Sequence, residues 1–297
     1  MSTKKPLFAF FGTPHFAVTV LNALESHGFL PALVITAPDK PADRGMELKM
    51  APAKKWALER GIDVLTPATL KDEALFAKLQ NTEWDVFVVA AYAKLIPKKF
   101  LEMPRHGALN VHPSLLPKFR GPSPVLSAIL ADEHTTGVSI MQMSEQMDTG
   151  PIVAQARVEL EEEAWPMPGS QFEDLLATEG GNLLAETLPL WIAGKITPEP
   201  QDESKATFTR KFTDADSLLR LKASDGQALI EFENPRQAFL QIRAFDKNPR
   251  AHVVTADGKR VIITDAEFAD GVLTITCVIP EGKKEMSYAD FVRGAKN

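Results

Sequence analysis

Cysteine is nearly absent from this sequence, which holds one, Cys277, among 297 residues. A single thiol excludes an intrachain disulfide and a multi-cysteine metal site, so we expect a reducing compartment, the cytoplasm, and no bound metal. Long apolar runs are lacking as well, because no segment approaches the roughly 20 apolar residues of a membrane span. The amino-terminal MSTKKPLFAFFG also lacks the longer apolar core and the cleavage site of a signal peptide. We therefore expect a soluble globular protein without a membrane partner.

An excess of basic charge is missing too. The net charge of −6 argues against indiscriminate binding of nucleic acid. The charge is unevenly distributed, since residues 206–297 hold 14 Lys and Arg against 13 Asp and Glu, whereas the first 205 residues hold 19 against 26. This relatively basic carboxyl-terminal part permits a polyanionic partner.

Short apolar segments alternate with helical patterns over the first 155 residues. Strands that are apolar throughout and separated by helices are typical of a mainly parallel sheet covered on both faces. The pattern predicts a doubly wound, Rossmann-like α/β domain whose ligands bind beyond the carboxyl ends of the strands. The expected strands are Leu7–Phe11, Leu33–Thr36, Val86–Val89, Ala108–Val111 and Val138–Met143, and the expected helices are Phe16–His27, Pro52–Arg60, Asp72–Gln80 and Pro124–Ala131.

Glycine is scarce where the first expected strand ends. That strand runs into Gly12-Thr13-Pro14, whereas a dinucleotide-binding turn needs the three glycines of G-x-G-x-x-G. A nicotinamide cofactor is therefore not expected, and Gly12 is interpreted as part of a tight strand-to-helix turn.

The carboxyl-terminal part shows a different pattern. Residues 196–205, ITPEPQDESK, are rich in proline and charge and are interpreted as a linker between domains at residues 1–195 and 206–297. Asp-Gly pairs at residues 257–258 and 270–271 lie between apolar runs and predict hairpin turns. We expect a small β-rich domain, a partial barrel, that holds a helix at Asn234–Phe245 and strands at Ala251–Thr255, Arg260–Thr264 and Leu273–Ile279.

The segment ALNVHPSLLPKFRG, residues 108–121, carries the most chemical information. Alternation along the expected strand places Asn110 and His112 on the same face, near its carboxyl end. Pro113 and Pro117 then begin a loop that cannot continue as a central strand. A lone histidine is more often structural, but an amide and an imidazole at the ligand-binding edge of an α/β sheet favour a functional site.

A second polar cluster follows the next apolar strand, in GVSIMQMSEQMDTGPIVAQ, residues 137–155. Asp148-Thr149-Gly150 is a turn signal. By itself, Asp148 is best interpreted as a solvated turn residue. If the two turns meet at the same edge of the sheet, Asp148 lies near His112.

Together, NVHPSLLPKFRG and MDTGPIVAQ resemble the folate-dependent formyltransferase family. The resemblance implies the formyltransferase fold and 10-formyltetrahydrofolate as co-substrate. It implies that the Asn, His and Asp of these motifs are catalytic, namely Asn110, His112 and Asp148. The loop that holds the folate in this family matches Ser114, Leu115, Leu116 and Pro117.

Two further segments concern the amine that accepts the formyl group. FFGTPHFA at residues 10–17 and APDKPADRGMELKM at residues 37–50 are similar to segments of the family members that formylate initiator methionyl-tRNA. In those members the second segment contacts the acceptor end of the tRNA, which implies contacts by Arg44, supported by Lys40 and Lys49. The other interpretation of this loop is an ordinary mobile surface connection.

The reaction implied by the resemblance is acyl transfer to a neutral amine. Asn110 is suited to donate its amide N–H to the oxyanion of the tetrahedral intermediate. His112 can relay a proton between the incoming amine and the departing nitrogen, and Asp148 can orient His112 or accept the proton itself. Which of these two groups is the formal base is left open.

The resemblance weakens beyond residue 200 and returns at residues 270–291, which implies an OB-like, tRNA-binding domain at residues 206–297. Two departures suggest that this barrel is abbreviated. FTDADSLLRLKASD follows Arg210-Lys211, and Phe268 is followed almost directly by Asp270-Gly271. One alternative is a formyltransferase for a small amine, such as an amino sugar or a purine precursor. Another is a non-enzymatic RNA-binding protein on a degenerate domain. We expect a monomer.

Overall fold

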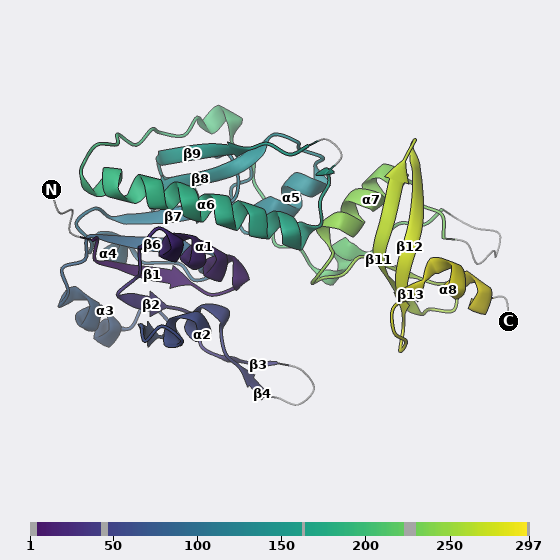
Figure 1. Ribbon diagram of the computed structural model, residues 1–297, viewed down its shortest axis with the longest axis horizontal. Helices are drawn as coiled ribbons and strands as arrows, with labels where there is room; N and C mark the ends of the chain where they lie inside the picture. The colour runs from purple at the N-terminus through teal and green to yellow at the C-terminus, as the bar shows by residue number, and fades with distance from the viewer. Residues whose placement is uncertain (1–4, 43–46, 162–163, 223–229, 296–297) are drawn as a thin grey trace. The chain divides into compact units, whose positions relative to one another are not determined.

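The computed structural model describes residues 5–42, 47–161, 164–222 and 230–295 (Figure 1). The chain divides into two compact units. The first comprises residues 1–121, 135–159 and 173–208, and the second comprises residues 122–134, 160–172 and 209–297. The segment expected as a linker, residues 196–205, is thus part of the first unit. The predicted domain boundaries stay a prediction.

In the described part of the first unit, seven strands form one sheet in the order β5-β2-β1-β6-β7-β8-β9. The first five strands in this order, β5, β2, β1, β6 and β7, are parallel to one another. Strand β8 is antiparallel to β7, and β9 is antiparallel to β8. The predicted mainly parallel α/β fold is therefore confirmed. The strands are β1 (Phe8–Gly12), β2 (Leu33–Ile35), β5 (Asp63–Leu65), β6 (Val86–Ala90), β7 (Ala108–His112), β8 (Thr136–Gln142) and β9 (Ile152–Val158).

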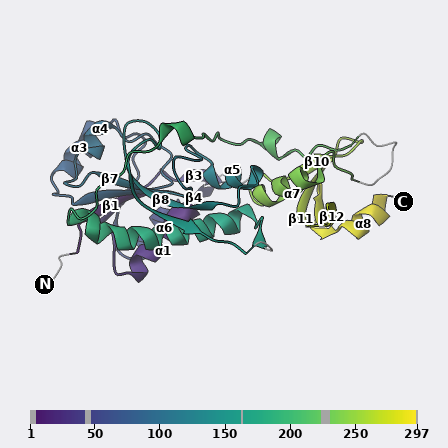
Figure 2. The same cartoon turned by 90° about the horizontal axis from the view of Figure 1, so that it is seen from above.

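Helices cover both faces of this sheet, with α1 and α6 on one side and α3 and α4 on the other (Figure 2). Alternation along β1 explains the two layers. Phe8 and Phe10 belong to the core under α1, α2 and α6, whereas Ala9 and Phe11 belong to the core under α3 and α4. The helices are α1 (His15–Ser26), α2 (Pro52–Leu58), α3 (Glu73–Gln80), α4 (Lys98–Leu101) and α6 (Gly169–Ile192).

Helix α6 approaches the sheet closely because it carries two adjacent glycines. A Cβ on Gly180 would lie 2.5 Å from Val111 Cγ1, and one on Gly181 would lie 2.5 Å from Ala23 Cβ. Val111 lies between Asn110 and His112 on β7, so its side chain faces α6 while theirs face the opposite side. Gly180 therefore lets α6 pack directly on the strand that carries both candidate residues, while Gly181 lets it pack on α1.

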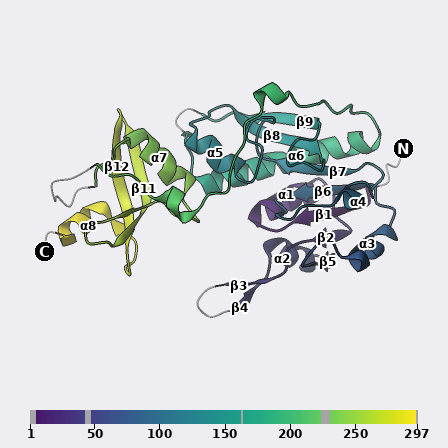
Figure 3. The ribbon, with the colours of Figure 1, turned by 180° about the vertical axis from the view of Figure 1, so that it is seen from behind.

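The second unit contains a sheet with the described order β10-β11-β12-β13, all antiparallel. Asp270 and Gly271, with φ of 52° and 77°, make the tight turn between its two long strands. Helix α7 packs against β11 and β12, and α8 packs against β12 (Figure 3). The predicted small β-rich domain is confirmed. Its elements are α5 (Pro124–Leu130), α7 (Pro235–Ala244), β10 (His252–Val254), β11 (Arg260–Ala269), β12 (Val272–Pro280), β13 (Met286–Ser287) and α8 (Tyr288–Ala295).

A short hairpin made of β3 (Lys40–Ala42) and β4 (Glu47–Lys49) forms a sheet of its own. Its register places Lys40 opposite Lys49. Arg44, the third expected tRNA contact, lies outside the described residues. Among the helices that are described, none is long and apolar enough to cross a membrane.

The close packing of α6 on β7 can be tested by Gly180→Ala. We expect it to lower the free energy of unfolding by about 1–3 kcal/mol, because the new methyl group overpacks the contact with Val111. Thermal and urea denaturation would measure the loss. Gly294→Ala in α8 is the matched control, since its Cβ would meet no atom of the described residues within 4 Å and alanine favours a helix. A Gly180→Ala protein as stable as the parent would contradict the packing.

Candidate functional site

Strand β7 presents the first two candidate residues at its carboxyl end. Asn110 is partly buried, and its amide has no hydrogen-bond partner within the described part of the chain. His112, two residues on, is 4% exposed. The side chains lie on the same face of the strand, as the alternation predicted. A polar amide without an internal partner at this position is available to a ligand.

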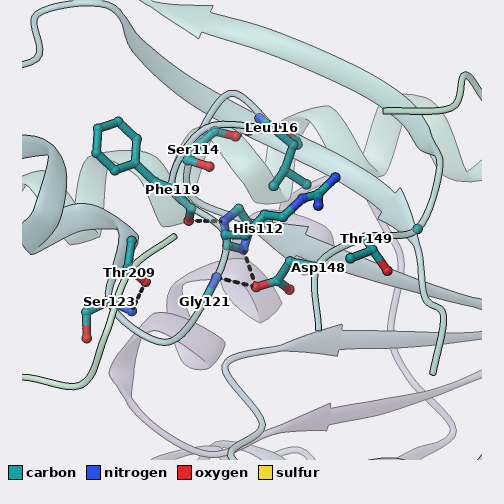
Figure 4. A network of polar contacts seen from close by, with 12 residues as sticks. His112, Ser114, Leu116, Phe119, Gly121, Ser123, Asp148, Thr149 and Thr209 are labelled. Carbon is teal, nitrogen blue, oxygen red and sulfur yellow. Dashed lines mark hydrogen bonds and ion pairs between the residues drawn. The ribbon is translucent and has the colours of Figure 1, made fainter. Parts of the chain in front are cut away.

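The imidazole of His112 is held by the loop that follows β7 (Figure 4). Its Nε2 lies 3.1 Å from the carbonyl oxygen of Phe119. Because a carbonyl oxygen can only accept, Nε2 carries the proton of the neutral ring. Nδ1 then has a free lone pair, and it lies 3.8 Å from Oδ2 of Asp148. The ring is therefore able to take up a proton on the side that faces the carboxylate.

Asp148 is brought to this loop by a strained turn after β8. Its φ is 55°, in the left-handed region that few non-glycine residues adopt. Its Oδ2 accepts a hydrogen bond of 2.7 Å from the backbone N–H of Gly121. Gly150 is required in the same turn because a Cβ there would lie 1.8 Å from the carbonyl oxygen of Gln142. The structure thus brings Asp148 to His112, on the strand that also carries Asn110.

The electrostatics favour a neutral imidazole at the start of a reaction. Burial lowers the pKa of His112 from its ordinary value, and the charge of Asp148 together with the Phe119 carbonyl partly opposes that shift. A neutral His112 can accept a proton, and the resulting imidazolium would be stabilised by the nearby carboxylate. The pair can therefore move protons, while the amide of Asn110 can donate to a developing oxyanion.

The expected folate loop is fixed against β8 and β9. Ser139, opposite His112 in the β7–β8 register, donates its hydroxyl to the Ser114 carbonyl at 2.6 Å and accepts the Leu116 N–H at 3.0 Å. Gln155 donates to the Leu116 carbonyl at 2.9 Å. Ser114 Oγ donates to the carbonyl of Lys118 at 2.6 Å. These bonds hold the loop backbone in one conformation beside the candidate catalytic residues.

The sequence did not reveal the residues that support the loop after β7 and the turn of Asp148. Ser139 lies on a strand that was predicted, and pairing β8 with β7 would have pointed to it. Arg120 is 1% exposed and donates two hydrogen bonds to Gln201. The two residues are 81 positions apart, and no local sequence pattern predicts that they meet. In the part of the chain that is described, no group of three or more His, Cys, Asp or Glu is arranged to hold a metal ion.

Comparison with known proteins agrees with this chemistry. The profile of the formyl transferase family matches residues 4–170. A methionyl-tRNA formyltransferase of Bacillus licheniformis is 36% identical over 313 residues, which cover 96% of this chain and 94% of the relative.

Solved structures share the fold at lower identity. A sugar N-formyltransferase from a Shewanella species has a TM-score of 0.61 at 18% identity, covering 89% of this chain and 99% of the other. HypX from Aquifex aeolicus, solved with tetrahydrofolic acid, has a TM-score of 0.62 at 16% identity, covering 97% of this chain and 47% of the other. Because the family profile covers more than half of the residues and the Bacillus relative spans nearly all of them, this chain belongs to the formyl transferase family.

Proposed function

We propose that this chain transfers the formyl group of 10-formyltetrahydrofolate to the α-amine of initiator methionyl-tRNA, for translation initiation. The observation that carries the proposal is the similarity to the Bacillus methionyl-tRNA formyltransferase, which extends over 96% of the chain and so includes the second unit. The buried imidazole of His112, the carboxylate 3.8 Å from it and the Asn110 amide on the same strand supply the chemistry of acyl transfer. The proposal places the enzyme in the cytoplasm, as a monomer.

Each of the three residues has a distinct role in the proposed reaction. Asn110 donates its amide N–H to the oxygen that becomes negative when the amine nitrogen bonds to the formyl carbon. His112 accepts the proton of the amine at Nδ1 and returns it to N10 of the folate as the bond between N10 and the formyl carbon breaks. Asp148, 3.8 Å away, stabilises the imidazolium in between. In this scheme His112 is the base and Asp148 is its electrostatic partner.

Two binding roles complete the proposal. The folate is held by the loop of Ser114, Leu115, Leu116 and Pro117. This role is supported by the hydrogen bonds that fix the loop backbone. The β3–β4 hairpin contacts the tRNA through Lys40, Arg44 and Lys49. The register pairs Lys40 with Lys49, so two basic residues lie at the same level of the hairpin, and phosphate contacts by basic residues add affinity for a nucleic acid.

The alternative is formyl transfer to a small amine. The sugar N-formyltransferase of Shewanella shares the fold over 89% of this chain, so the presence of a second unit does not by itself select tRNA. The deciding experiment supplies the purified protein with 10-formyltetrahydrofolate and either methionyl-tRNA, free methionine or an amino sugar. Formylation of methionyl-tRNA alone supports the proposal. Preference for a small amine overturns the acceptor, and no transfer at all favours the non-enzymatic alternative.

Asn110→Ala tests the oxyanion role. We expect kcat to fall by about 10²–10³-fold, the usual cost of losing one oxyanion donor. Stability should be unchanged, because the amide has no partner to lose within the described residues. Steady-state kinetics and thermal denaturation measure the two effects. An increase in KM with kcat unaltered would instead make Asn110 a binding residue.

The pKa of His112 provides a second test that needs no substrate. Titration followed by NMR, with the signal assigned from its loss in His112→Ala, should give a pKa below the ordinary value of about 6.5 because the ring is buried. Asp148→Asn should lower it further, since the carboxylate charge raises it. Folding stability should correspondingly decline as pH falls from 6.5 through the folded-state value. An upward shift in Asp148→Asn would be inconsistent with the proposed pairing.

Lys49→Ala tests the tRNA contact. Loss of one phosphate contact should raise KM for methionyl-tRNA and reduce the slope of log(kcat/KM) against log[salt] by about one, while KM for the formyl donor stays the same. Lys78→Ala on α3 is the matched control, because it removes another exposed lysine of the first unit away from the hairpin. If both variants keep the parental salt slope, the hairpin does not bind tRNA.

A further inference from the structure

Arg120 is a buried cation with an unusually complete set of partners. Its side chain is 1% exposed, and its guanidinium donates two hydrogen bonds to Oε1 of Gln201, from Nε at 3.0 Å and Nη2 at 2.8 Å. Two more reach Glu203, from Nη1 at 2.8 Å and Nη2 at 2.7 Å. A buried charge is costly unless it is paired and hydrogen-bonded. Such an arrangement within an enzyme domain requires an explanation.

Gln201 connects this cation to the turn of Asp148. Because Gln201 Oε1 accepts from Arg120, its Nε2 must face the other way, and it donates to the carbonyl oxygens of Asp148 at 2.8 Å and Gly150 at 2.7 Å. All four hydrogen-bonding positions of the amide are therefore used. The two carbonyls flank Thr149, so the amide holds the turn on both sides. Gln201 thus stabilises the turn at Asp148, the residue whose φ is 55°.

The backbone beside Arg120 also contacts Asp148, through its carboxylate. Gly121, the next residue, donates its N–H to Asp148 Oδ2 (Figure 4). The Arg120 N–H donates to the Thr207 carbonyl at 2.9 Å, and the Phe119 N–H donates to Thr207 Oγ1 at 2.8 Å. Residues 201–207 therefore contact both the turn of Asp148 and the loop whose Phe119 carbonyl holds His112.

Glu203 has a separate electrostatic effect. Arg120 interacts with the charge of Asp148 as well as with that of Glu203. The bidentate contact with Glu203 neutralises the guanidinium. Without Glu203, the unpaired guanidinium of Arg120 would attract the Asp148 carboxylate, which faces His112.

We propose that Arg120 and Gln201 are positioning residues, which aim the carboxylate of Asp148 at His112. The proposal rests on the function proposed above for Asp148. A purely structural role would stabilise the fold without altering the relation between the carboxylate and the imidazole. The positioning role predicts that this relation changes when Gln201 is replaced.

Gln201→Met is the decisive variant, because it keeps the length of the side chain, adds no charge and removes both carbonyl contacts. We expect kcat to fall by about 10- to 100-fold as the carboxylate shifts away from its working position. KM for the formyl donor should stay within twofold of the parent. The NMR titration of His112 should move to lower pH, since the raising effect of Asp148 weakens with distance.

Asp202→Asn is the matched control. It alters the neighbouring residue, whose carboxylate bonds to Ser204 and Lys205 and to neither Arg120 nor the Asp148 turn. We expect parental kcat and an unshifted His112 titration. If Gln201→Met does not fold, Gln201→Asn keeps the amide but shortens its reach, and the same outcomes are expected of it.

The proposal is overturned if a folded Gln201 variant keeps parental kcat, or if it loses activity and stability while the titration of His112 stays in place. The titration requires no substrate, so it tests the positioning even if the parent formylates an amine other than methionyl-tRNA. In that event kcat is measured with the amine that the parent accepts. Failure of the proposed acceptor is thereby distinguished from failure of the positioning role.

Discussion

The geometry of the candidate site depends on the hydrogen bond from the Gly121 N–H to the carboxylate of Asp148. It joins the loop after β7 directly to the turn after β8. The same loop holds His112 through the Phe119 carbonyl, so this contact between loops helps to set the relation of imidazole to carboxylate. A charge-assisted bond is strong enough for this purpose because the site is largely shielded from water.

The antiparallel pairing of β8 with β7 adds a second constraint. A further parallel strand would have required a crossover connection, whereas the observed pairing places Ser139 directly opposite His112. From there the Ser139 hydroxyl reaches the backbone of the loop at Ser114 and Leu116. The departure from a purely parallel sheet thus fixes the loop proposed to hold the folate. Rigid elements beneath a loop are what allow it to keep a defined shape.

Much of the fold was predictable because local signals were strong. Apolar strands and helical patterns, and the Asp-Gly turn at residues 270–271, led to elements that the structure confirms. Membership of the formyltransferase family, expected from the two motifs, is confirmed as well. Helix α6 was missed, since Gly180, Gly181 and Pro189 are poor helix formers on local grounds. His112 and Asp148 lie 3.8 Å apart, Asn110 lies on the same strand as His112, and the roles of all three stay predictions.

The sequence by itself determined the class of fold, the two motifs and the face of β7 on which Asn110 and His112 lie, because periodicity and turn chemistry act over a few residues. Only the tertiary structure decided that Asp148 meets His112 and that Arg120 contacts Gln201. These pairs are 36 and 81 residues apart, and no local preference encodes such a separation. Burial lowers the pKa of His112 and makes the Arg120 guanidinium depend on Gln201 and Glu203 for hydrogen bonds, because folding excludes water from the His112 and Arg120 side chains.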